Sequence, residues 1–276
     1  MRIMLAVNLS CCCVFSHANA EEMLLLDVVS LLPTQHAEAE ILKQVLANYP
    51  GKYLVEQVNR HRARERVRTG NNVCMPWLQK TPERLREYQF SLPYMLEDSL
   101  QLVLRQHSAA HRKILQSTEP MVSLQQLLAT QMLLLGIEQN RSYGAELDTI
   151  LTEAQQLHNP SLYLRTTPSQ DVGSLLPMLD RDFLDAIIEY PKIAKRSGLP
   201  LVYYPIKEAP AVNLVYFACS NTAVGTRIIA KLNQSIQTLA AQADYRNLVL
   251  AQLPFDSHAQ ALQYWQSALA TDSSAK

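Results

Sequence analysis

One arginine, Arg84, has the chemistry and the position to bind an anion. It lies in the stretch "TPERLREYQFSLPY", residues 81–94, shortly after the apolar run "VCMPWL". A guanidinium forms paired, charge-assisted hydrogen bonds with a carboxylate. Ligands of open α/β sheets bind beyond the carboxyl ends of strands, and Arg84 would lie there if the apolar run is a strand. The competing interpretation is a salt-bridged arginine on an exposed helix. In either case we expect Arg86 and Glu87 to face solvent.

Two further groups of polar residues follow apolar runs in distant parts of the chain. Ser142 and Tyr143 lie in "NRSYG", between "LLLGIE" and the helical pattern "AELDTILTEAQQL". The free N–H groups of a helix N-terminus suit a carboxylate or a phosphate. Glu189 and Tyr190 end the run "DAIIEY". We expect the three groups to share one cleft.

No other chemistry is indicated by the sequence. The histidines are scattered, and His107 and His111, four residues apart, have no third ligand nearby, so we predict no metal site and no cofactor. Neither a G-x-S-x-G elbow nor a glycine-rich phosphate loop is present. Basic and acidic residues balance at 25 each, which argues against a nucleic-acid partner. The basic stretch from Arg60 to Arg68 is interpreted as a solvated helix face.

The elements that would position these residues alternate between strands and helices. This order is typical of α/β proteins with crossover helices, and the length of the pattern indicates two sheets. The run 121–137 is interrupted by polar residues and is not interpreted as a membrane span. Predicted strands cover 24–32, 52–59, 73–78, 99–105, 133–138, 161–167, 185–190, 199–206 and 213–221. Predicted helices cover 37–49, 60–69, 145–157, 170–184 (apart from Pro177), 226–242 and 261–270, with Ser123 as a cap for another.

The N-terminus has the layout of a secretory signal peptide. A basic residue, a short apolar core and the ending Ala18-Asn19-Ala20 predict that residues 1–20 are cleaved and that the protein is periplasmic. Three of the five cysteines leave with this segment. The remaining two, Cys74 and Cys219, pair in an oxidising compartment or stay as buried thiols, and the sequence leaves both alternatives open.

The stretch "NNVCMPWLQKTPERLREYQFSLPY" resembles the extracytoplasmic solute-binding proteins of family 3, the amino-acid-binding group. Their pattern is a G-x-x-D strand, then T-x-x-R, then F-S-x-P-Y. Later segments that resemble the family follow in the same order, and the resemblance covers roughly residues 23 to 255. The chain looks most like an uncharacterised, divergent branch of that family.

The resemblance implies a two-lobed periplasmic binding protein-like fold (type II), in which each lobe is a mixed, mostly parallel sheet flanked by helices. It implies lobe 1 at 21–103 and 211–276 and lobe 2 at 104–210. A small carboxylated, amino-acid-like ligand would bind between the lobes, with Arg84 on its carboxylate. Ser142 and Tyr143 would add donors, and Glu189 would receive an amino group. Thr81 belongs to the same motif as Arg84.

The same resemblance bears on partners and on alternatives. The chain would act as a monomer that delivers its ligand to a membrane ABC transporter or a signalling receptor, without being an enzyme and without spanning the membrane. An enzyme on the same scaffold, similar to a dehydratase, is the first alternative, and a ligand-free sensor or interaction module is the second. Pro76, Trp77 and Gln79 replace the family's small hydroxyl residues, and Asn72 replaces its aspartate. Trp77 is either an apolar wall of the pocket or a core tryptophan.

Overall fold

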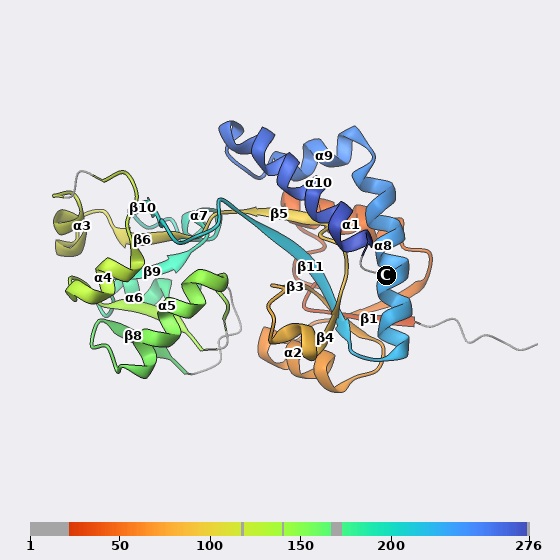
Figure 1. The fold of residues 1–276 in the computed structure, drawn as a ribbon, viewed down its shortest axis with the longest axis horizontal. Coiled ribbons are helices and arrows are strands. Elements are labelled where there is room, and N and C mark those ends of the chain that lie inside the picture. Colours follow the sequence, from red (N-terminus) through yellow and green to blue (C-terminus); the bar gives the residue numbers. More distant parts are fainter. Residues whose placement is uncertain (1–21, 117–118, 140, 167–172, 275–276) are drawn as a thin grey trace, which may run out of the picture.

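The computed structural model describes residues 22–116, 119–139, 141–166 and 173–274, and the predicted signal peptide lies outside them. The chain forms two lobes, each built on its own sheet (Figure 1). We call the lobe that contains the first sheet lobe 1 and the other lobe 2. None of the helices in these ranges is long and apolar enough to cross a membrane.

The sheet of lobe 1 has the strand order β2-β1-β3-β11-β4, with β5 paired to β11. β1, β2 and β3 are parallel, and β11 runs antiparallel to β3, β4 and β5. The strands are β1 (Glu22–Leu26), β2 (Lys52–Glu56), β3 (Val73–Leu78), β4 (Tyr88–Phe90), β5 (Met95–Asp98) and β11 (Val212–Ser220).

The sheet of lobe 2 has the order β10-β6-β9-β7-β8. β7 is parallel to β8 and β9, whereas β6 is antiparallel to β9 and β10. The strands are β6 (Gln101–Arg105), β7 (Leu135–Glu138), β8 (Leu162–Arg165), β9 (Ala186–Glu189) and β10 (Leu201–Pro205). The predicted mixed, mostly parallel sheets are confirmed, because in each described sheet only β11 or β6 runs against the other strands.

The chain crosses between the lobes twice, from β5 to β6 and from β10 to β11 (Figure 1). Each crossing leads directly into the reversed strand of the next sheet. At the crossings, β5 and β11 lie side by side, and Asn213 donates a side-chain hydrogen bond of 3.1 Å to the carbonyl of Asp98. Two adjacent strands therefore connect the lobes, which is the arrangement in which hinge closure occurs.

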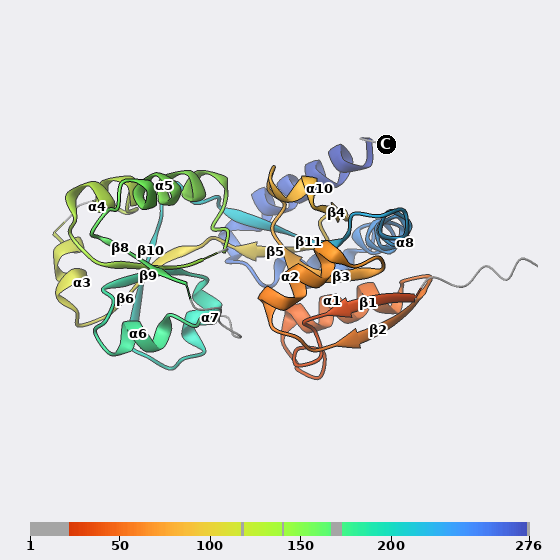
Figure 2. The same ribbon diagram turned by 90° about the horizontal axis from the view of Figure 1, so that it is seen from below.

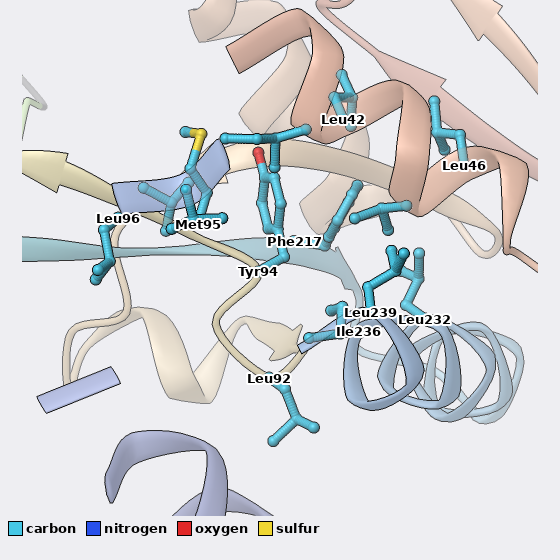
Figure 3. Close-up of a cluster of buried hydrophobic side chains, with 14 of the residues drawn as sticks. Leu42, Leu46, Leu92, Tyr94, Met95, Leu96, Phe217, Leu232, Ile236 and Leu239 are labelled. Atoms are coloured by element: carbon cyan, nitrogen blue, oxygen red, sulfur yellow. The ribbon is translucent and has the colours of Figure 1, made fainter. Parts of the chain in front are cut away.

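The helices of lobe 1 cover both faces of its sheet. Helix α2 (Arg60–Thr69) packs on one face through Ala63 and Val67, with Asn59 capping its first turn. The other face packs on α1 (Ala37–Ala47), α8 (Ala223–Ala240), α9 (Ala243–Leu250) and α10 (His258–Ser274). Leucines of α1 and α8 meet Tyr94 and Phe217 there (Figure 3).

The helices of lobe 2 lie on opposite faces of the second sheet (Figure 2). One side holds α3 (Ala109–Ile114), α4 (Leu124–Thr130) and α5 (Ala145–Gln156), and the other holds α6 (Leu176–Asp180) and α7 (Pro191–Lys195). The predicted helix over 170–184 is wrong in its extent, because α6 is the only α-helix among its described residues, 173–184. Pro177 lies inside α6, in its first turn, where its missing N–H has no helical partner to lose.

A disulfide joins β3 and β11 in the core of lobe 1. Cys74 and Cys219 occupy paired positions of these antiparallel strands, and both side chains are buried. The structure therefore selects the bonded alternative. It also explains the "FSLPY" motif, in which Ser91 exchanges hydrogen bonds of 3.0 Å with the backbone of Phe217 on β11. The hydroxyl of Tyr94 donates to the carbonyl of Pro76 on β3 at 3.0 Å.

Candidate functional site

A cleft between the lobes lies where strands of both sheets end. In lobe 1, Asp27 directly follows β1, Gln57 follows β2 and Gln79 follows β3. In lobe 2, Arg141 comes shortly after β7, and Tyr190 directly follows β9. All five residues border one cavity. The cleft is therefore in the position that α/β sheets use for ligands.

Two cavities make up this cleft. The first, here called the small cleft, has a volume of about 380 Å³ and extends from α1 of lobe 1 to α7 of lobe 2. The second, the large cleft, has a volume of about 1350 Å³ and extends from α2 to α5. Both are bordered by the same central residues, which are Arg64, Gln79, Arg84, Arg141, Ser142, Asn213 and Leu214. A volume of a few hundred Å³ suits a small ligand.

Arg84 begins a short 3-10 turn and borders both cavities. Its side chain donates one hydrogen bond, from Nη1 to the carbonyl of Gln79 at 3.0 Å, and no carboxylate forms an ion pair with it among the described residues. Burial lowers the pKa of the Arg84 guanidinium, and the positive charge of Arg64 lowers that pKa further. The charges of Asp148 and Glu83 partly offset this effect without an ion-pair contact, and the guanidinium is half-buried in the cleft. Arg86 and Glu87 are exposed, as predicted.

Thr81 and Trp77 lie near Arg84 in sequence, and each borders a different one of the two cavities. The hydroxyl of Thr81 accepts a hydrogen bond of 3.4 Å from the backbone N–H of Arg84, and Thr81 borders the large cleft. Trp77 borders the small cleft and also packs against the lobe 1 core, 6.4 Å from the ring of Tyr94. Its indole N–H donates to the carbonyl of Asp27 at 3.3 Å. Trp77 therefore combines the two roles that the sequence left open.

Ser142 connects the lobes across the cleft. Its Oγ lies 2.5 Å from Asp148 Oδ2 and 2.9 Å from Gln79 Oε1. A hydroxyl carries one proton, so it donates to the carboxylate of Asp148, and a flipped Gln79 amide then donates its own N–H to Ser142. Asp148 also accepts the backbone N–H of Tyr143 at 2.7 Å. Part of the anion-binding capacity at the start of α5 is thereby used inside the protein.

Tyr143 and Glu189 are held by contacts within lobe 2. Tyr143 is 1% exposed, and its hydroxyl accepts the backbone N–H of Glu138 at 2.9 Å. Glu189 is 1% exposed and accepts two hydrogen bonds from Arg141, at 2.8 and 2.6 Å. Burial would lower the pKa of Arg141, but the carboxylate of Glu189 raises it well above its usual value. Glu189 borders neither cavity, and Arg141 lies between it and the cleft.

The sequence interpretation missed Arg64. The solvated face expected for α2 is correct for Arg68, which pairs with Glu65 on the same helix, but wrong for Arg64. Arg64 is half-buried and borders both cavities, and burial lowers its pKa. The sequence contained a signal for this position. Arg64 is adjacent to the apolar stripe of Ala63 and Val67, which packs on the sheet, so its side chain starts at the boundary of the buried face of α2.

The sequence interpretation also missed a set of ion pairs that joins the lobes. Lys192 on α7 lies 2.9 Å from Glu38 on α1 and 3.4 Å from Glu97 on β5. Arg196 lies 3.4 Å from Glu38. Burial favours the neutral form of Glu38, but the charge and hydrogen bond of Lys192 outweigh it, so the pKa of Glu38 falls below its usual value. Glu38 is therefore ionised at neutral pH and attracts lobe 2.

Metal binding has no structural support in the described part of the chain. No group of three or more histidine, cysteine, aspartate or glutamate side chains comes together there in a way that could hold an ion. The cleft instead offers guanidinium, ammonium, hydroxyl and amide groups, all of which suit an organic anion.

Comparison with known proteins shows the fold. No family model matches the chain, and no curated protein matches its sequence. Among solved structures, the arginine-, lysine-, histidine-binding protein ArtJ from Geobacillus stearothermophilus is 13% identical, with a TM-score of 0.60 over 87% of this chain and 99% of that one. A structure from work on glutathione import via GshT and the cystine ABC importer TcyBC of Streptococcus mutans is 16% identical, with a TM-score of 0.61 over 83% of this chain and 93% of that one.

A histidine kinase sensor domain with similarity to periplasmic binding proteins also shares the architecture. It is 13% identical, with a TM-score of 0.60 over 83% of this chain and 94% of that one. These similarities extend over both lobes. The predicted two-lobed, periplasmic binding protein-like fold is confirmed, and at this identity the comparisons concern the fold alone.

Proposed function

We propose that this chain is an exported solute-binding protein that closes its lobes on a small carboxylated ligand. The observation that carries the proposal is Arg84, a half-buried guanidinium in the interlobe cleft that makes no direct ion pair with a carboxylate of the described residues. A buried charge without a counter-ion is costly, and a ligand carboxylate removes that cost.

The other predicted site residues are assigned supporting roles. Trp77 is an apolar wall of the small cleft, and Thr81 fixes the turn from which Arg84 projects. Ser142 contacts the ligand once closure brings it opposite Arg84. Tyr143 and Glu189 act through lobe 2, where Glu189 orients Arg141 toward the cleft.

The two crossing strands provide the hinge for closure. In this proposal lobe 1 comprises 21–103 and 211–276, lobe 2 comprises 104–210, and residues 1–20 direct export to the periplasm. The protein delivers its ligand as a monomer to a membrane ABC transporter or to a signalling receptor. The fold occurs both in binding proteins of ABC importers and in a histidine kinase sensor domain, which is consistent with either role.

Binding without catalysis is the function that the site supports best. The one acid among the predicted site residues, Glu189, is buried and makes two hydrogen bonds with Arg141. A general acid or base must reach the substrate, and this carboxylate borders neither cavity. Cofactors and metals have no role in the proposal.

A thermal-shift screen tests the proposal. Purified protein is heated with amino acids, small peptides and organic acids, and a ligand that binds the native state raises the melting temperature by mass action. We expect carboxylated compounds to be the hits. Each hit is then titrated against the Arg84→Ala variant, which should bind at least about ten times more weakly, because charged hydrogen bonds are lost.

Arg86→Ala is the matched control, because Arg86 lies on the same short turn but is exposed. A hit that binds Arg84→Ala as tightly as the wild type would overturn the proposed role of Arg84. Chemical conversion of a hit by the wild-type protein would favour the enzyme alternative. Absence of any carboxylated hit would favour an interaction module.

A further inference from the structure

The charges around the small cleft are strongly unequal. Of the described residues, six with cationic side chains border it, namely Arg60, Arg64, Arg84, Arg141, Lys192 and Arg196, against three acidic ones, Asp27, Glu38 and Glu97. Glu189, just behind the wall, balances Arg141. With Glu189 included, the described cations around the small cleft exceed the described acids by two; Asp148, whose charge also acts on Arg84, borders only the large cleft. The cleft therefore favours a ligand that carries more than one negative charge.

Each acid that borders the small cleft already contacts a cation of the protein. Asp27 accepts hydrogen bonds from Gln57 at 3.1 Å and from Arg60 at 3.3 Å. Glu38 and Glu97 both contact Lys192, at 2.9 and 3.4 Å. A ligand ammonium group would have to displace one of these contacts. Among the described residues that border the cavity, every carboxylate is thus already in contact with a cation, and none is left for an amino group.

Arg84, unlike the acids, makes no direct contact with a side chain of opposite charge in the described part of the chain. Arg84 makes a single side-chain hydrogen bond, to a neutral carbonyl, and its remaining N–H groups are available on the cleft side. Arg64 borders the same two cavities, and its charge acts on Arg84. An anion between the two guanidinium groups would reduce their mutual repulsion whatever other contacts Arg64 makes.

We propose that the ligand of the small cleft is an organic dianion, such as a short dicarboxylate, rather than a zwitterionic amino acid. This inference rests on the proposed function, because it refines the chemistry of the same site. One carboxylate binds Arg84 through paired hydrogen bonds. The second lies in the field of Arg64, where an α-ammonium group would be repelled.

The test is isothermal titration calorimetry of the purified protein at low ionic strength with two sets of probes. The first set is the linear dicarboxylates with three to six carbon atoms. The second is amino acids of matched length, including glutamate, which adds an ammonium group to a dicarboxylate, and glutamine, which has one carboxylate and an ammonium group. We expect the best dicarboxylate to bind at least about ten times more tightly than glutamate or glutamine. Its affinity should fall as salt is added.

Variants connect that result to the cleft. Arg84→Gln should weaken binding of the best dicarboxylate by about 10- to 100-fold, because charged hydrogen bonds are lost. Arg86→Gln, on the same turn and exposed, should leave it unchanged. Equal losses in the two variants would mean that the ligand binds elsewhere and would overturn the proposal.

Two other outcomes separate this inference from the proposed function. If an amino acid binds as tightly as every dicarboxylate, and Arg84→Gln weakens it, the dianion inference is wrong while the carboxylate-binding function stands. If no probe of either set binds, both the inference and the proposed function are wrong.

Discussion

The core of lobe 1 and the cleft beside it are built from opposite kinds of contact. The core joins an apolar cluster of two dozen or more side chains with a disulfide and with buried hydrogen bonds from Tyr94, Tyr245 and Trp265. The small cleft, which begins where β3 ends, is bordered by charged and amide side chains together with apolar ones. The two regions share β3, whose buried part holds Cys74 and whose end leads to Arg84.

The difference indicates where stability comes from and where recognition is located. Buried apolar area and satisfied hydrogen bonds stabilise the fold. Partly exposed ion pairs contribute little, and a buried charge without a partner destabilises. The core should therefore respond strongly to substitution, whereas changes in the cleft should alter lobe closure and ligand affinity with small effects on stability.

The largest effect is expected from loss of the disulfide. Cys74 and Cys219 are 145 residues apart in sequence. In the chain-entropy model, a loop of this length restricts the unfolded state enough to contribute about 5 kcal/mol to the free energy of unfolding. We expect the double variant Cys74→Ala, Cys219→Ala to lose much of that free energy, as measured by urea unfolding. Two reactive thiols in the denatured, unreduced protein without residues 1–20 would contradict the bond.

Much of this core was predictable from the sequence. The run "VCMPWL" predicted a strand at 73–78, which coincides with β3. The motif "FSLPY" was identified by its resemblance to the family pattern. Its hydrogen bonds to β11 show that it joins the end of β4 to the core of lobe 1. β4 and β5 were missed because "YQF" and "MLED" are short and contain polar residues, unlike the longer apolar runs that marked β7 and β9.

The cleft was less predictable because its geometry depends on pairs of distant residues. Arg84 was identified from its motif, and it lies in the cleft. Arg141 and Glu189, which pair, are 48 residues apart in sequence, and the pair of Glu38 and Lys192 joins different lobes. Neither pair therefore produces a local sequence pattern. Charge periodicity on α2 concealed Arg64, because a cleft-facing arginine and a solvated one look alike in sequence.

A second prediction concerns the C-terminal helix. Trp265 is fully buried and donates its indole N–H at 2.8 Å to the carbonyl of Pro93, within the "FSLPY" motif that bonds to β11. Trp265→Phe leaves that carbonyl without a donor and opens a small cavity, so we expect a loss of about 2 kcal/mol in urea unfolding. Tyr264→Phe is the control, because Tyr264 is 49% exposed on the same helix and should change stability little. If Trp265→Phe lowers the free energy of unfolding as little as Tyr264→Phe does, α10 lies outside the cooperative core.

The third prediction is that low pH breaks the ion pairs that join the lobes. The pKa of Glu38 lies below its usual value of 4.5 in this structure, so its attraction for Lys192 and Arg196 is complete above pH 4.5 and is lost as the pH falls through the lowered pKa. Small-angle X-ray scattering should show a larger radius of gyration below that range while circular dichroism remains native. Glu38→Gln should open the lobes already at neutral pH.

The expected shift is modest. A partly exposed ion pair contributes about 1 kcal/mol, which changes the ratio of open to closed molecules about fivefold. Glu40→Gln is the control, because Glu40 pairs with Lys43 within α1 and is half exposed. A radius of gyration that is the same in Glu38→Gln and the wild type would show that these ion pairs do not hold the lobes together.

The smallest effect, and the one with the opposite sign, is expected at Arg84 in the absence of ligand. Burial and the charge of Arg64 lower the pKa of Arg84, which means that the charged form is less favourable in the folded protein than in the unfolded chain. Because arginine is charged at all pH values below that pKa, this penalty is present throughout the neutral range. Arg84→Gln removes the charge and should raise the free energy of unfolding slightly, whereas exposed Arg86→Gln should not. The measurement is urea unfolding of both variants without ligand. A lower stability for Arg84→Gln would mean that Arg84 stabilises the fold as the core does, and the division between a stabilising core and a recognising cleft would not hold at this residue.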